Sequence, residues 1–151
     1  MTHLPEAGLG TKLRHLLALL DDDVQAVYDE LGVPFRPRFY PIVQQLLRHD
    51  ECGVTALAEA VGVSQPAMTQ TLAEMRKLGL LSSSPGEDPR QRLTRLTDSG
   101  RELAGRLERV WRATTASAAE LEAETRLSDA VDRARAALAR RPFKDRIKER
   151  M

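Results

Sequence analysis

Hydrophobic residues recur at helical spacing near the start of the chain. Between residues 11 and 32 the apolar positions follow alternating steps of four and three: Leu13, Leu17, Leu20, Val24, Val27 and Leu31. This period predicts a helix with one continuous apolar stripe, which Gly32 and Pro34 end. Such a stripe can pack internally or against a second copy of the chain. A second helix is predicted from Pro37 with an apolar side made of Phe39, Ile42, Val43, Leu46 and Leu47.

Two short amphipathic helices are predicted next, within residues 55–78. In the first helix and its turn the residues predicted to be buried are Leu57, Val61 and Val63, and in the second Met68, Leu72 and Met75. Gly62 is expected to end the first helix with a positive φ, and Ser64 is expected to cap the second. A short turn with glycine between two short helices is the helix-turn-helix pattern.

The pattern changes after Gly79. The stretch LLSSSPGEDPRQRLTRLT, residues 80–97, predicts two strands around a polar turn, which form a hairpin with an arginine-bearing tip. Thr97 is the predicted N-cap of a long helix, and a final helix carries Leu127, Val131, Ala134 and Leu138 with Pro142 near its end. The basic tail RRPFKDRIKER is either a contact to DNA phosphate or a solvated helix end, and the second interpretation is favoured. The fold is therefore predicted to be mainly α with a small β-hairpin wing.

The second helix of the pair has an outer face of uncharged polar residues. Pro66 falls in the first turn, where backbone N–H groups lack intrahelical partners, so its missing donor costs little. Gln65, Thr69 and Gln70 are predicted to point outward, with Arg76 and Lys77 further along. Glutamine pairs with adenine, threonine contacts thymine, and basic residues meet phosphates. The alternative is an ordinary solvated helix face; the adjoining hairpin favours DNA.

The run from residue 55 to 103 resembles the winged helix-turn-helix of the multiple antibiotic resistance regulator (MarR) family. The residues that carry the resemblance are the LAEAVGVSQ turn, the LGLL before the wing, and EDPRQRLTRLTDSGREL. The last stretch has an aspartate, an arginine two residues later, and then Leu96, Thr97, Gly100 and Leu103. The order of the outer helices also fits, so the resemblance extends over nearly the whole chain, with RPRFYPIVQQLL matching more loosely.

The resemblance implies a single domain over residues 1–151 that forms a homodimer. Helices at 11–32 and 104–151 would form the dimer interface, and the core at 37–103 would bind DNA. Two winged modules would read a pseudo-palindrome with half-sites about 10 base pairs apart. The residues implied to face the major groove are Ser64, Gln65, Pro66, Thr69 and Gln70. Arg90 would enter the minor groove, Asp88 would orient that arginine or the wing backbone, and Arg92 and Arg95 would contact phosphates.

Composition adds three limits. A chain of 151 residues with 42% apolar and 30% charged residues suits a soluble protein, and its net charge of +1 does not indicate a nucleic-acid binder. From Thr55 to Asp98 five basic residues balance five acidic ones, so we expect modest, salt-sensitive DNA affinity. The single cysteine, Cys52, excludes an internal disulfide and favours the cytoplasm. No signal peptide and no apolar run of roughly 20 residues is present, so no membrane partner is expected.

Several residues have a functional and a plain interpretation. Tyr28, Phe35, Phe39, Tyr40 and Trp111 either line a cavity for a small aromatic or apolar effector, as in ligand-responsive relatives, or pack in the core. Cys52 has no adjacent Lys or Arg, which favours a passive cysteine over a redox sensor. Asp21, Asp22 and Asp23 diverge around a helix, and His3, His15 and His49 lack metal-ligand spacing, so no metal or cofactor is expected.

No phosphate-binding loop, nucleophile elbow or His/Glu metal motif is present, so an enzyme is not predicted. The sequence predicts a dimeric, cytoplasmic, DNA-binding transcriptional regulator. Two alternatives remain: a regulatory module that partners a catalytic domain, and a winged-helix protein that binds another protein. Arg90 together with Gln65 and Gln70 favours DNA, because a protein-binding module needs no arginine at the wing tip.

Overall fold

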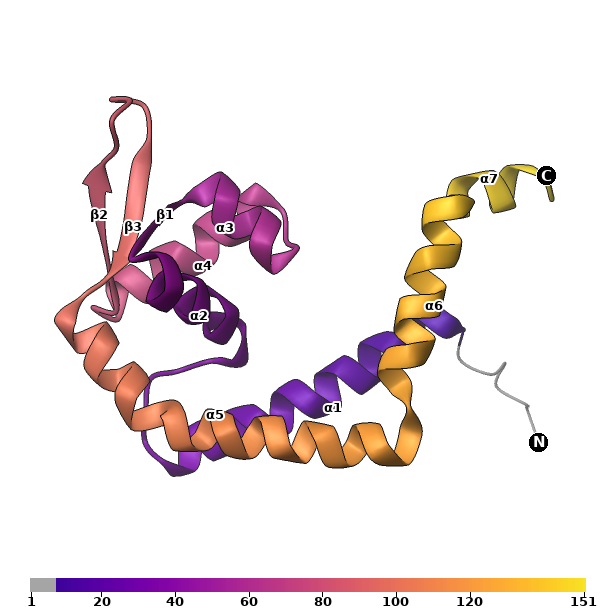
Figure 1. The fold of residues 1–151 in the computed structure, drawn as a ribbon, viewed down its shortest axis with the longest axis horizontal. Helices are drawn as coiled ribbons and strands as arrows, with labels where there is room; N and C mark the ends of the chain where they lie inside the picture. The colour runs from indigo at the N-terminus through magenta and orange to yellow at the C-terminus, as the bar shows by residue number, and fades with distance from the viewer. Residues whose placement is uncertain (1–7) are drawn as a thin grey trace, which may run out of the picture. The chain divides into compact units, whose positions relative to one another are not determined.

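The computed structural model describes residues 8–151 and is mainly helical, with one small sheet (Figure 1). The elements are α1 (Leu9–Glu30), the 3-10 helix η1 (Pro37–Phe39), α2 (Tyr40–His49), β1 (Glu51–Gly53), α3 (Val54–Val61), α4 (Gln65–Lys77), β2 (Leu81–Pro85), β3 (Arg92–Leu96), α5 (Asp98–Thr125), α6 (Leu127–Arg140) and α7 (Phe143–Lys148). The chain divides into two compact units within α5, one ending at Leu107 and one formed by Glu108–Met151. This boundary lies near the predicted one at 103/104, and the single domain stays a prediction.

The apolar stripe of α1 is largely exposed to solvent in the first unit. The exposed stripe residues are Leu13, Leu17, Leu20, Val27 and Leu31, while Tyr28 is the buried residue of the helix. The helix starts and ends two residues earlier than the predicted range of 11–32. It ends at Glu30 because Gly32 adopts a left-handed φ of +63° and stops it. The stripe is therefore not part of the core of the first unit, and its packing against a second copy of the chain stays a prediction.

The sheet has three strands, where the sequence predicts a two-stranded hairpin. Its order is β1-β3-β2, with β3 pairing antiparallel to both neighbours, and Figure 1 shows the strands side by side. The extra strand β1 comes from the ECG stretch, where Cys52 lies opposite Thr94. This stretch is only three residues long and contains an acidic residue and a glycine, so its sequence shows no alternation of apolar and polar residues that would predict a strand. This strand exists because β3 supplies its hydrogen-bonding partners.

The core of the first unit follows the predicted helix faces with three corrections, the first of which is that Val61, predicted to be buried, is only half-buried. Met68, Leu72 and Met75 of α4 and Leu57 of α3 are buried as predicted. Val63, predicted to be buried, is 42% exposed, because left-handed Gly62 turns the chain outward and Ala58 fills the core instead. Leu47, predicted on the apolar side of α2, is 41% exposed, because Ile42, Val43 and Leu46 occupy the buried face and Leu47 lies at its edge.

Thr97 and Gly100 join the wing to α5. The Thr97 hydroxyl donates a hydrogen bond to the Gly79 carbonyl oxygen at 2.6 Å and accepts one from the Gly100 N–H at 3.0 Å. This confirms Thr97 as the helix cap. Gly100 is buried, and a Cβ on it would lie 2.2 Å from the Leu80 carbonyl oxygen. The two ends of the wing therefore meet at a helix turn that has room only for glycine.

Replacing Gly100 with alanine is expected to destabilise the protein by about 1–3 kcal/mol, because the helix must move away from the Leu80 backbone. Gly105 provides the matched control, since it lies on the same helix and a methyl group added to it would meet no described atom within 4 Å other than its chain neighbours and the nearby backbone of its own helix. Gly105→Ala is expected to gain up to about 1 kcal/mol from helix propensity. Urea unfolding monitored by circular dichroism measures the free energy of unfolding of both variants. Equal effects of the two substitutions would contradict the close packing at Gly100.

The second unit contains the end of α5 with α6 and α7. The predicted final helix is α6, and a further short helix, α7, follows it with Pro142 as its N-cap residue. Pro142 therefore separates two helices instead of lying near the end of one. The exposed large apolar residues of α6 and α7 are Val131, Leu138, Phe143 and Ile147. Among the described residues, no helix is long and apolar enough to cross a bilayer.

Candidate nucleic-acid interface

The start of α4 is built as the sequence predicts. The Ala67 N–H donates to the Ser64 hydroxyl at 3.3 Å, which caps the helix, and Pro66 lies in the first turn. Gly62 has a φ of +79° and ends α3 two residues before that cap. The chain therefore forms two short helices joined by a tight turn, and the N-terminal end of α4 is exposed.

All seven predicted interface residues of this helix and its cap lie on the solvent side. They are Ser64, Gln65, Pro66, Thr69, Gln70, Arg76 and Lys77. The uncharged members lie in the N-terminal half of α4, and the two cations lie in its last turn. This order is the one expected of a recognition helix, in which polar side chains contact base edges and cations contact phosphates, and the contacts themselves stay a prediction.

The tip of the wing is held by Asp88. Its carboxylate accepts a hydrogen bond from the Arg90 N–H at 2.9 Å, and its carbonyl oxygen accepts one from the Gln91 N–H at 2.9 Å. Asp88 therefore orients the wing backbone, one of its two predicted roles. The Arg90 side chain is exposed at this ordered turn, and Arg92 and Arg95 are exposed on β3. Arg95 does not face the buried side of the sheet, where Thr94 and Leu96 lie.

A hollow of about 570 Å³ lies between the wing and the start of α3. Arg90 and Arg92 border it on the wing side, and Thr55 and Glu59 border it on α3. The sequence does not indicate Thr55 as an interface residue, because only the fold brings the first turn of α3 beside the wing. Arg90 and Arg92 therefore border the same open space as the first turns of α3.

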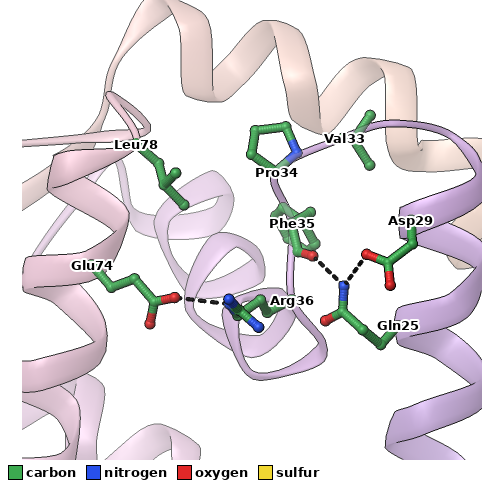
Figure 2. A pocket seen from close by; sticks show the side chains of 8 residues that line it. All are labelled: Gln25, Asp29, Val33, Pro34, Phe35, Arg36, Glu74 and Leu78. Carbon is green, nitrogen blue, oxygen red and sulfur yellow. Dashed lines mark hydrogen bonds and ion pairs between the residues drawn. The ribbon is translucent and has the colours of Figure 1, made fainter.

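Two of the predicted effector residues belong to an aromatic cluster in the core of the first unit. Tyr28 and Phe39 are buried on either side of Phe35, with ring centroids 5.1 Å and 5.6 Å from the Phe35 ring. Tyr40 is exposed, and Trp111 is buried and belongs to the second unit. A separate pocket of about 240 Å³ is lined by Gln25, Asp29, Val33, Pro34, Phe35, Arg36, Glu74 and Leu78 (Figure 2). The effector and its residues stay a prediction.

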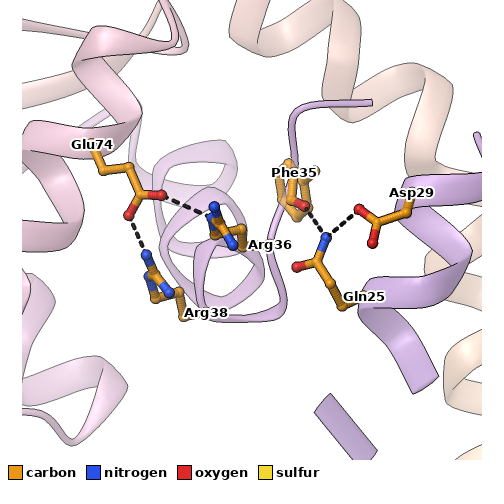
Figure 3. A network of polar contacts seen from close by, with 6 residues as sticks. All are labelled: Gln25, Asp29, Phe35, Arg36, Arg38 and Glu74. Atoms are coloured by element: carbon orange, nitrogen blue, oxygen red, sulfur yellow. Dashed lines mark hydrogen bonds and ion pairs between the residues drawn. The ribbon is translucent and has the colours of Figure 1, made fainter. Parts of the chain in front are cut away.

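One wall of this pocket is an ion-pair network (Figure 3). Arg36 Nε donates to Glu74 Oε1 at 2.8 Å, and Arg38 donates to the other oxygen, Oε2. The Arg38 hydrogen bond, with the charges of both arginines, holds the pKa of Glu74 below its usual value, against the opposing effect of partial burial. This network was not predicted from the sequence. The alternation Phe35-Arg36-Pro37-Arg38-Phe39 could have indicated it, because aromatic residues that point into the core leave the arginines between them on the outside.

Cys52 lies half-buried on β1. Burial raises the pKa of its thiol, and the adjacent Glu51 carboxylate raises it further. The thiol form therefore dominates at neutral pH, which fits the predicted passive cysteine. Within residues 8–151, no three His, Cys, Asp or Glu side chains are grouped to hold a metal ion.

No protein-family model matches the chain, and no curated protein matches its sequence. Solved structures match its fold. The transcriptional regulator MosR of M. tuberculosis, solved with DNA, has a TM-score of 0.71 at 21% identity, covering 89% of this chain and 99% of that one. The S. aureus MepR–DNA complex has a TM-score of 0.74 at 14% sequence identity, covering 88% of this chain and 99% of that one. A Bacillus cereus structure described as a MarR-like transcription regulator has a TM-score of 0.69 at 19% sequence identity, covering 86% of this chain and 95% of that one. The chain therefore has the winged helix-turn-helix fold of MarR-type regulators.

Proposed function

We propose that this protein is a non-enzymatic, cytoplasmic transcriptional regulator that binds double-stranded DNA with sequence specificity. The observation that carries the proposal is the pairing of two exposed elements in one unit: the capped N-terminal end of α4 and the arginine-bearing wing tip that Asp88 orders. Gln65, Thr69 and Gln70 set the base preference in the major groove. Arg90 reads the width of the minor groove. The DNA complexes of two proteins with this fold support the proposal.

We further propose that the regulator acts as a homodimer on a pseudo-palindromic operator. In the first unit α1 exposes its apolar stripe, and in the second unit α6 and α7 expose Val131, Leu138, Phe143 and Ile147. Apolar faces of this length on a water-soluble helix favour association, because burying them removes their area from water. A twofold dimer places two winged modules on successive major grooves, with half-sites about 10 base pairs apart.

Selection of bound duplexes from a random library tests the proposal. The expected result is enrichment of a pseudo-palindrome whose half-sites are separated by about one helical turn. Enrichment of a single half-site would contradict the dimer. An unenriched pool would contradict DNA reading and favour the protein-binding alternative.

A further inference from the structure

The C-terminal half of α4 is tied to the segment between α1 and α2 by a single carboxylate. Glu74 projects from α4 and is 30% exposed, and each of its two oxygens accepts from a different arginine, Arg36 and Arg38. Figure 3 shows the two guanidinium groups on the same side of α4. When both oxygens of a carboxylate are paired, the orientation of the carboxylate is restrained as well as its distance from the arginines, because charge-assisted hydrogen bonds are geometrically specific.

The backbone that carries the two arginines is anchored in the core, while their side chains are about half exposed. Each stands next to a phenylalanine, Phe35 or Phe39, and both rings are buried and meet edge-to-face at 5.6 Å. The Arg38 guanidinium carbon also lies 5.6 Å from the centre of the Phe39 ring. On the other side, the Gln25 amide donates to the Phe35 carbonyl oxygen at 3.3 Å and so fixes this segment to α1. The restraint on Glu74 therefore starts from ordered core residues.

The inner face of α4 does not provide the same restraint. Two of its three buried residues are methionines, Met68 and Met75. Methionine is unbranched and adapts its shape, so these contacts tolerate small rotations of the helix. Glu74 lies four residues after Gln70, hence nearly above it on the same flank of the helix. A rotation that moves Glu74 away from its arginines moves Gln70 with it.

We propose that Glu74 is a positioning residue for DNA recognition, which holds α4 in the orientation that presents its N-terminal face to base edges. This role rests on the DNA-binding function proposed above. This role also predicts whether removing the Glu74 carboxylate raises or lowers the affinity for DNA. By charge alone, removing an acid from a DNA-facing helix strengthens DNA binding. A positioning role predicts the opposite for specific binding.

The test compares Glu74→Gln with the wild type on two duplexes at one fixed salt concentration: the duplex recovered by selection and a scrambled duplex of equal length. We expect affinity for the selected duplex to fall about fivefold or more, while affinity for the scrambled duplex stays equal or rises. Asp50→Asn is the matched control, because it also removes one acid from an exposed ion pair, with Arg101 at 3.1 Å, that does not include α4. It is expected to leave the ratio of the two affinities unchanged.

Arg38→Gln tests the same contact from the other side. We expect it to show a loss on the selected duplex that does not exceed that of Glu74→Gln, because the Arg36 contact remains. The double variant is expected to be no weaker than Glu74→Gln alone, because Glu74→Gln already removes the interaction with Arg38. Arg38→Gln also decides the matter if Glu74→Gln does not fold. Equal or tighter binding of Glu74→Gln to the selected duplex, or additive losses, would overturn the positioning role. A wild type that selects no sequence would instead overturn the DNA-binding function itself.

Discussion

Leu17→Glu is expected to convert the protein into a folded monomer that has lost most of its operator affinity. Leu17 is 60% exposed in the middle of the α1 stripe, so the substitution removes no core contact of its own unit. In a twofold interface it would bury two carboxylates among apolar side chains, which is costly without partners. Because two linked modules bind a two-site operator far more tightly than one, affinity is expected to fall by about 100-fold or more.

Light scattering gives the mass of the particle, and a titration of the selected duplex gives its affinity. The wild type is expected at twice 16.8 kDa and the variant at 16.8 kDa. Leu19→Glu is the matched control, since Leu19 is 65% exposed on the same helix but lies away from the stripe. It is expected to remain dimeric. If Leu17→Glu also remains dimeric with full affinity, the α1 stripe is not the interface.

Arg90→Ala is expected to weaken binding to the selected duplex by about 1–3 kcal/mol, the range of a lost specific contact. The tip backbone remains ordered, because Asp88 accepts from the Arg90 backbone N–H and not from its side chain. Arg90→Lys keeps the charge but has a more strongly hydrated head group, so we expect an intermediate loss. A gel-shift titration at fixed salt measures all three proteins.

Arg95→Ala removes the same charge from the other end of β3, where Arg95 lies opposite Ser82 and Glu51. Its loss is expected to be smaller than that of Arg90→Ala and equal for selected and scrambled duplexes, because a phosphate contact carries no sequence information. If the two variants bind alike, the wing tip has no special role in groove reading.

The features that the sequence predicts well are local. Ser64 caps α4, Gly62 ends α3 and Thr97 caps α5 within three or four residues of the groups that they satisfy. Met68, Leu72 and Met75 follow helical spacing and are buried. In each case the physical cause, an unsatisfied N–H group or an apolar period, lies within one or two turns of chain, where a sequence pattern shows it.

Two of the three features that escaped prediction depend on residues far apart in the chain. β1 exists because β3 pairs with it, more than 40 residues later, as at Cys52 and Thr94. Glu74 meets Arg36 and Arg38 across 38 and 36 residues. Val63 is exposed because the left-handed turn at Gly62 redirects the chain, and an apolar residue in a turn carries no sign of that direction. Tertiary contacts decide the first two features, and the direction of a local turn decides the third.

A parallel selection with the wild type, Gln70→Ala and Lys77→Ala tests the central claim most directly, that the outer face of α4 reads bases. If it does, Gln70→Ala relaxes the preference at the same position of both half-sites, since a bidentate contact is worth about 1–3 kcal/mol of base discrimination. Lys77→Ala is expected to recover the wild-type sequence with uniformly weaker binding, as loss of a phosphate contact requires. An unchanged consensus with Gln70→Ala would contradict the account.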